Sequence, residues 1–157
     1  MIEIYLLRHA DAGDPARWDG DDAERPLSGK GLRQAGRLAA MLRGLGWRPD
    51  AILTSPKRRA AETAEIIGQA LGLAPRVDGR LGTGFGAAEL AELLARDSAG
   101  RRLLLVGHDP DLSDLASVLV GATIQLRKGS LIRIDVHGPA NAGVMRWLIP
   151  PDAVPGV

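Results

Sequence analysis

Two histidines and two arginines are the residues of this chain whose types and positions best suit chemistry. Arg8 and His9 directly follow a short apolar run, and His108 follows another. Arg59 lies four residues after Ser55, which itself follows a third apolar run. Guanidinium groups can hold phosphoryl oxygens, a neutral imidazole can attack phosphorus, and a second imidazole can donate a hydrogen bond or a proton. Together these side chains predict an anion pocket that contains a nucleophile, and its chemistry requires no metal ion.

These side chains need elements that bring them to one place. The apolar runs predict buried strands at residues 2–7, 50–54 and 101–106. The first two candidate strands stop directly before Arg8 and Ser55, and the third stops before Gly107, which precedes His108. In open α/β sheets, ligands bind outside the carboxyl ends of the strands. We therefore expect the three strand ends to line one crevice.

The alternation of strands and helices predicts the fold class. Helical patterns begin after Ser28, after Ser55, at Ala87 and near Asp111. Two alternating segments near the C-terminus predict a hairpin whose loop spans residues 137–143. We expect an α/β three-layer sandwich, with a mostly parallel central β-sheet flanked by helices and an antiparallel hairpin near the C-terminus. Residues 1–157 are expected to form a single domain.

Apolar spacing also predicts which helix faces are buried. In the first helix we expect the inward residues to be Leu32, Ala35, Leu38, Ala39, Leu42 and Leu45, and in the second helix Ala60, Ala64, Ile67 and Leu71. In the third helix they are expected to be Leu90, Leu93 and Leu94, and in the fourth Leu115, Val118 and Leu119.

The second helix carries cations where a helix favours anions. Ser55 is expected to be its N-cap, with Pro56 at the first helical position. Arg58 and Arg59 then lie in the first turn, where positive charge opposes the helix dipole. Arg58 can pair with Glu62 one turn later. Arg59 is therefore the better candidate for holding a phosphate at this helix end.

Composition excludes several classes of function. The 157 residues carry a formal net charge of +1, which argues against a basic nucleic-acid-binding surface. The chain has no cysteine, so thiolate catalysis and cysteine-bound metals are excluded. No apolar run reaches the roughly 20 residues that span a bilayer, and no signal peptide is evident. We expect a cytoplasmic protein with no cofactor, no nucleic-acid partner and no membrane association.

The motifs resemble those of the histidine phosphatase superfamily, also called the phosphoglycerate mutase-like superfamily. Residues 7–10, Leu-Arg-His-Ala, resemble its Arg-His-Gly signature, with Ala10 in place of the glycine. Residues 55–63 are similar to its second motif, in which a serine precedes the pocket arginine by four residues and a threonine follows it by four. Gly107-His108 is similar to the segment around its second histidine, and residues 25–28, Arg-Pro-Leu-Ser, match a common family feature. The short chain most resembles the SixA-like phosphohistidine phosphatases.

The resemblance implies a role for each pocket residue. His9 is expected to be the nucleophile that becomes phosphorylated, with Arg8 and Arg59 holding the phosphoryl group. His108 is expected to complete the pocket and stabilise the group during transfer. Ala10 would be strained if the backbone at that position required the positive φ that glycine tolerates.

The proton donor is the role without an obvious residue. Larger members of the family carry a carboxylate between the second arginine and the second histidine, and Glu89 is the only acid near that place. Its position within the third predicted helix favours a solvated surface residue. The other candidate acids are Asp11, Asp14 and Asp109. Residues 11–27 are expected to be a solvated loop with surface acids at Asp19, Asp21, Asp22 and Glu24.

A pocket without a strong acid favours a phosphoramidate over an ordinary phosphate ester, because an alkoxide leaving group benefits more from a proton donor. We therefore expect a phosphatase that removes phosphate from phosphohistidine on a signalling or phosphorelay protein. Two alternatives stay open. One is a phosphatase for small phosphomonoesters, and the other is a phosphoprotein-binding module without catalysis.

Overall fold

One six-stranded sheet organises the computed structural model, which describes residues 1–96, 101–138 and 142–156. Its strands are β1 (Ile2–Arg8), β2 (Ala51–Thr54), β3 (Arg76–Val77), β4 (Arg102–Gly107), β5 (Leu131–Val136) and β6 (Gly143–Ile149). They lie in the order β3-β2-β4-β1-β5-β6. The first four are mutually parallel, whereas β5 pairs antiparallel with both β1 and β6. The predicted mostly parallel sheet with a C-terminal antiparallel hairpin is confirmed, although residues 139–141 of the expected hairpin loop lie outside the described residues.

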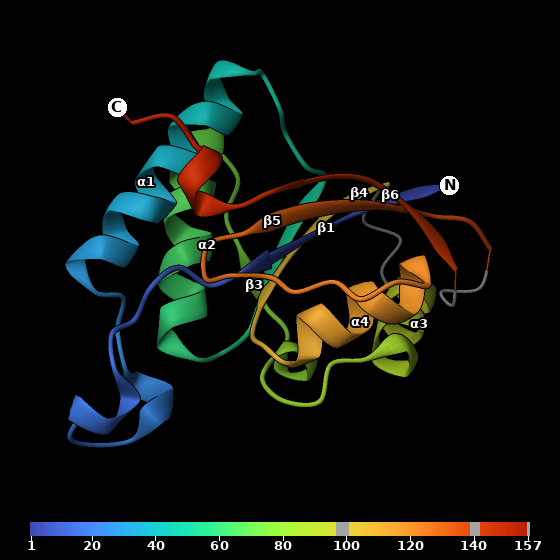
Figure 1. Cartoon of the computed structure of the whole chain (residues 1–157). Helices are drawn as coiled ribbons and strands as arrows, with labels where there is room; N and C mark the ends of the chain where they lie inside the picture. The colour runs from blue at the N-terminus through green and yellow to red at the C-terminus, as the bar shows by residue number, and fades with distance from the viewer. Residues whose placement is uncertain (97–100, 139–141, 157) are drawn as a thin grey trace.

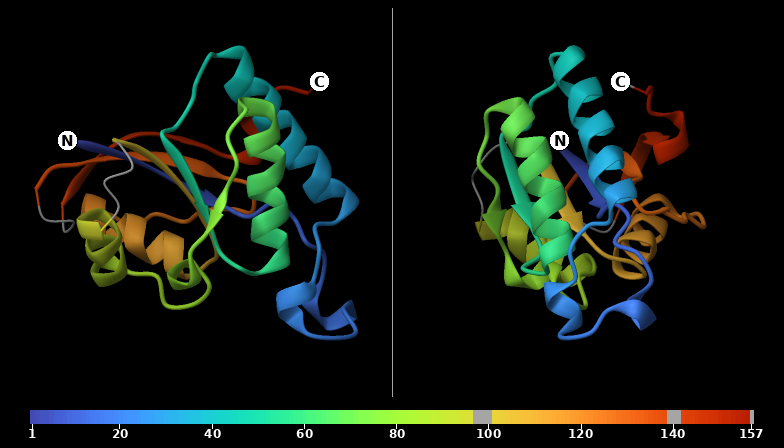
Figure 2. Two further views of the ribbon diagram at one scale, coloured as in Figure 1. Left: turned by 180° about the vertical axis from the view of Figure 1, so that it is seen from behind. Right: turned by 90° about the vertical axis from the view of Figure 1, so that its left-hand side faces the viewer.

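Helices cover both faces of the sheet, which confirms the expected three layers (Figures 1 and 2). The α-helices are α1 (Gly29–Gly44), α2 (Arg58–Leu71), α3 (Ala87–Arg96) and α4 (Asp111–Val120). Short 3-10 turns are η1 (Pro15–Arg17), η2 (Asp22–Glu24), η3 (Gly79–Leu81) and η4 (Pro151–Ala153). Helices α1 and α2 pack on one face, and α3 and α4 pack on the other. None of the described helices is long and apolar enough to cross a membrane.

The central strand β1 is buried on both faces because neighbouring side chains point in opposite directions. Tyr5 and Leu7 pack with α1 and α2. Ile4 and Leu6 pack with α3 and α4. The continuous apolar run in the sequence is therefore the signature of a strand sandwiched between two helical layers.

Three predicted inward residues face solvent instead. Leu32 and Leu45 are 50% and 72% exposed, and Val118 is 60% exposed. Leu45 follows the last residue of α1 as its C-cap, so it leaves the helical face. Leu32 lies outside the buried face of α1, which consists of Gly31, Ala35, Leu38, Ala39 and Leu42.

The predicted N-cap of the second helix was wrong. Helix α2 begins at Arg58 rather than next to Ser55, and its N-cap residue Lys57 makes no side-chain capping bond. The Ser55 hydroxyl instead accepts the Lys57 N–H before the helix and contacts His108, which is distant in sequence. Asp111 is the first residue of α4, and its carboxylate accepts a hydrogen bond from the Gly84 N–H (2.7 Å).

Candidate active site

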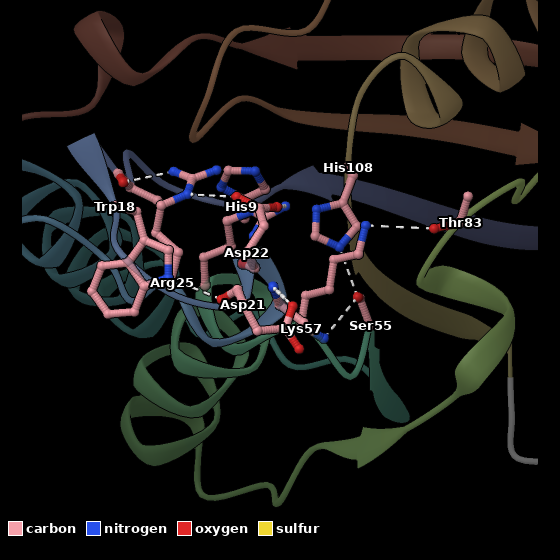
Figure 3. Close-up of polar contacts among 12 residues, drawn as sticks. His9, Trp18, Asp21, Asp22, Arg25, Ser55, Lys57, Thr83 and His108 are labelled. Carbon is pink, nitrogen blue, oxygen red and sulfur yellow. Dashed lines mark hydrogen bonds and ion pairs between the residues drawn. The ribbon is translucent and has the colours of Figure 1, made fainter. Parts of the chain in front are cut away.

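Three neighbouring parallel strands end at the same level. In the register of β1 with β4, Arg8 lies opposite Gly107, and β2 ends with Thr54 opposite Val106 of β4. The next residues along the three strands are therefore His9, His108 and Ser55. The His9 N–H donates to the Gly107 carbonyl (3.0 Å), and the imidazole rings of His9 and His108 have centroids 5.2 Å apart. The sequence-predicted convergence is thus present in the structure (Figure 3).

The His9 ring presents an unprotonated nitrogen. Its Nδ1 lies 2.7 Å from the Ala10 carbonyl oxygen, which can only accept a hydrogen bond. Nδ1 therefore carries the proton, and Nε2 keeps its lone pair. Burial, followed by the charges of Arg59 and Arg8, lowers the pKa of His9 to about 4. The imidazole is consequently neutral near pH 7 and suited to act as a nucleophile.

His108 has the same tautomer as His9, and its contact is with Ser55. The fully buried Ser55 hydroxyl accepts the Lys57 N–H (3.1 Å) and lies 2.7 Å from His108 Nε2. We infer that the hydroxyl donates its proton to Nε2, which leaves the proton of the neutral His108 ring on Nδ1. Burial, then the nearby His9 and Arg59, lower the pKa of His108 to about 3. His108 is therefore a neutral donor at the pocket.

Three buried donors around His9 are unused. Arg8 Nε, Arg59 Nε and His108 Nδ1 have no hydrogen-bond partner among the residues that the structure describes. A buried donor left unpaired costs free energy, on the order of 1–3 kcal/mol. Here three residues around a nucleophile each carry one such donor. An oxyanion bound beside the nucleophile would accept hydrogen bonds from all three.

Other contacts hold the two guanidinium groups in place. Arg8 Nη1 donates to the Leu126 carbonyl (2.7 Å) and lies 3.4 Å from Asp109 Oδ2. Arg59 donates through Nη1 to the Asp22 carbonyl (2.8 Å) and through Nη2 to Asp22 Oδ2 (3.1 Å). Both arginines thus keep their Nε groups free while their terminal nitrogens are anchored.

Asp22 is the site residue that sequence reasoning missed, because it was expected to be a solvated loop acid. The segment between β1 and α1 is folded back by side-chain contacts. Trp18 Nε1 donates to the Asp21 carbonyl (2.9 Å), and buried Arg25 donates to the Ala12 carbonyl (2.7 Å). Arg25 Nε also bonds Asp22 Oδ1 (3.0 Å). The signal available in the sequence was Arg25 in the Arg-Pro-Leu-Ser motif, since its burial is what holds this turn against the pocket.

The acids considered as proton donors have other partners. Glu89 accepts the Gly86 N–H (2.9 Å) at the start of α3, and Asp14 accepts the Ala16 N–H (2.9 Å) in η1. Asp11 accepts the Ser28 hydroxyl (2.5 Å). Asp109 accepts both the hydroxyl (2.6 Å) and the N–H (3.1 Å) of Ser113. Asp22 is a further acid beside the pocket, and its carboxylate directly contacts Arg59.

Ala10 is accommodated without strain. No residue other than glycine has a positive φ within the described ranges, so Ala10 adopts ordinary backbone geometry. Its N–H donates to the hydroxyl of Thr63 (3.2 Å), the threonine of the second motif. This bond ties the residue after the nucleophile to helix α2.

A cavity of about 570 Å³ opens beside Arg8. Polar and charged side chains contribute to its lining, among them Asp109, Ser113, Gln125 and Arg127. It shares Arg8 with the pocket, whereas His9, Arg59 and His108 do not line it.

Comparisons with known proteins agree with this geometry. The family model of the histidine phosphatase superfamily (branch 1) matches residues 4–91. An uncharacterized protein of Picosynechococcus sp. is 36% identical, over 95% of this chain and 100% of that protein. The solved structure of the protein histidine phosphatase SixA complexed with tungstate is similar with a TM-score of 0.81 at 21% identity, over 96% of this chain and 98% of that one. A mycobacterial glucosyl-3-phosphoglycerate phosphatase has a TM-score of 0.68 at 21% identity, over 93% of this chain and 97% of its own.

Proposed function

The chain belongs to the histidine phosphatase superfamily, and on that premise we propose that it hydrolyses its substrates through a phosphoenzyme formed on His9. One observation carries the proposal. A neutral imidazole with a free Nε2 lone pair is surrounded by three buried N–H donors without partners in the described structure, on Arg8, Arg59 and His108. These donors suit the oxygens of a phosphoryl group, and the lone pair suits attack on its phosphorus.

The reaction follows from these positions in two steps. His9 Nε2 attacks phosphorus, the bond to the leaving group breaks, and its electron pair departs with that group. The two guanidinium groups and His108 Nδ1–H stabilise the charge on the three transferring oxygens. Water then attacks the phosphohistidine, and the P–N electron pair returns to His9. Inorganic phosphate is released and the protein is regenerated.

The substrate class that we favour is phosphohistidine carried on a partner protein. The likeness to SixA supports it, because it extends over nearly the whole of both chains. The pocket mouth also suits a protein partner, since the Asp22 side chain at its edge is 54% exposed. Recognition would then involve the surface around the phosphohistidine rather than an enclosed ligand site.

A small phosphorylated molecule is the second candidate, and the cavity of about 570 Å³ beside Arg8 favours it. The structural likeness to a glucosyl-3-phosphoglycerate phosphatase lends further support. A binding module without catalysis is disfavoured, because such a module has no need for a neutral imidazole with its lone pair directed away from the Ala10 carbonyl.

The test is intact-mass spectrometry at neutral pH within seconds of mixing with a phosphohistidine peptide or with phosphoramidate. We expect a transient phosphoryl adduct that maps to His9, together with release of phosphate. The His9→Ala variant should show neither. The matched control is His137→Ala, which removes an exposed histidine distant in sequence from the pocket motifs. Absence of both adduct and phosphate release with phosphoramidates and phosphomonoesters would contradict the proposal.

A further inference from the structure

Asp22 lies beside the arginine that is expected to hold the transferring phosphoryl group. Its Oδ2 is 3.1 Å from Arg59 Nη2. Its Oδ1 is 3.0 Å from Arg25 Nε (Figure 3). Among the described residues, its carboxylate bonds with these two arginines, and the side chain is 54% exposed. The carboxylate is therefore both next to the phosphoryl position and accessible to solvent at the pocket mouth.

We propose that Asp22 is the proton donor to the leaving group in this pocket. The inference rests on the proposed function, because it assigns a further role in the same reaction. His9 attacks from the closed end of the pocket, where it is 6% exposed, so the leaving group must depart toward solvent. Asp22 is on the solvent side, on the short turn η2 that packs against α2.

Substrate binding changes the charge balance around this carboxylate. In the free protein, hydrogen bonding to Arg25 and the charge of Arg59 hold the pKa of Asp22 below its usual range. A bound phosphoryl dianion neutralises the charge of Arg59 and adds negative charge next to the carboxylate. Both effects favour the protonated form. The acid is thus formed in the complex, where it is needed, rather than in the free protein.

The proton balance of the step is complete. As the P–O or P–N bond breaks, its electron pair passes to the leaving oxygen or nitrogen, which takes the proton from the Asp22 carboxyl group. In the second step the Asp22 carboxylate takes a proton from the attacking water. The protein therefore returns to its starting state after each turnover.

Asp109 is the competing acid, because it also lies near a pocket arginine, 3.4 Å from Arg8. Its two oxygens are held by the Ser113 hydroxyl and N–H at the start of α4. Its side chain is only 18% exposed. This carboxylate is bound to its own helix and mostly buried, whereas that of Asp22 is exposed on the solvent side, where the leaving group departs.

The experiment compares substrates that differ in their need for a proton. The leaving group of p-nitrophenyl phosphate departs as a stable phenolate, whereas the more basic leaving group of phenyl phosphate requires protonation. We expect Asp22→Asn to reduce kcat by about 10²-fold or more with phenyl phosphate, the usual scale of general acid catalysis. With p-nitrophenyl phosphate the reduction should be less than about tenfold. Inhibition by inorganic phosphate should be as strong as in the wild type or stronger, which reports an intact pocket.

Glu24→Gln is the matched control, because it removes an exposed acid from the same turn without touching Arg59. It should leave all the rates unchanged. An equal reduction with every substrate would overturn the proposal and leave Asp22 as a positioning residue for Arg59. Leaving-group dependence in Asp109→Asn instead of Asp22→Asn would also overturn it. If the wild-type protein releases phosphate from none of the substrates, the proposed function itself fails.

Discussion

At the scale of single residues, one hydroxyl group sets which nitrogen of His108 carries a proton. Ser55 satisfies the Lys57 N–H and leaves its own proton for His108 Nε2. Without that proton donor, Nε2 can take up the hydrogen and Nδ1 can no longer donate to a phosphoryl oxygen. Ser55 is therefore a positioning residue whose effect on the reaction passes through His108.

Ser55→Ala is expected to reduce kcat by about 10²-fold, the scale of losing one donor to a transition state. Nitrogen NMR of the imidazole rings supplies the decisive readout. The wild-type protein should show the proton of His108 on Nδ1, and the variant should show it on Nε2. The matched control is Ser130→Ala, which removes another buried hydroxyl that has no partner among the described residues. An unchanged His108 tautomer in Ser55→Ala would disprove the positioning role.

At the scale of elements, the features that depend on the local sequence pattern, such as buried strands, are predicted well from the sequence. The buried strands are marked by apolar runs, and the position of His9 and His108 directly after two of them follows from those runs alone. Ser55 and Asp22 were misassigned, as an N-cap and a solvated acid. Their actual partners are 53 and 37 residues away, at His108 and Arg59. No local periodicity reports contacts over such separations, so the fold had to be known first.

The contact between α1 and the segment after His9 gives a test of element packing. A Cβ atom built on Gly31 would overlap the backbone carbonyl of Asp11. Gly31→Ala is therefore expected to lower the free energy of unfolding by about 1–3 kcal/mol, as overpacking usually does. It should also reduce activity, because the displaced backbone lies two residues after the nucleophile.

Gly36 is the matched control on the same helix, since a Cβ atom there meets nothing within 4 Å. Gly36→Ala should raise the free energy of unfolding by about 1 kcal/mol through helix propensity. Urea denaturation of both variants measures the difference. Equal stability of the two would show that Asp11 and α1 are not in close contact in solution.

At the scale of the whole molecule, the site has a cost in stability that depends on pH. The sheet places His9 and His108 at adjoining strand ends, under helices and next to arginines, where each is only 6% exposed. The pKa values are lowered to about 4 and about 3, respectively. Neutral imidazoles suit the proposed chemistry, but the unfolded chain binds protons at these histidines near pH 6.5. At pH values between the folded and unfolded pKa values, the unfolded chain therefore binds more protons at these histidines than the folded protein does, and this opposes folding.

The free energy of unfolding should consequently fall as the pH is lowered from about 7 to 5. The unfolded state binds more protons than the folded state throughout that range, so stability rises with pH there. For two histidines the loss amounts to roughly 4 kcal/mol, at up to about 1.4 kcal/mol per pH unit and proton. Carboxylates with lowered pKa values, such as Asp11 and Asp22, stay ionised over this interval and add little. Urea unfolding at several pH values measures the slope, and most of it should vanish in the double variant His9→Asn/His108→Asn. A slope that persists unchanged in the double variant would place the titrating groups elsewhere in the molecule.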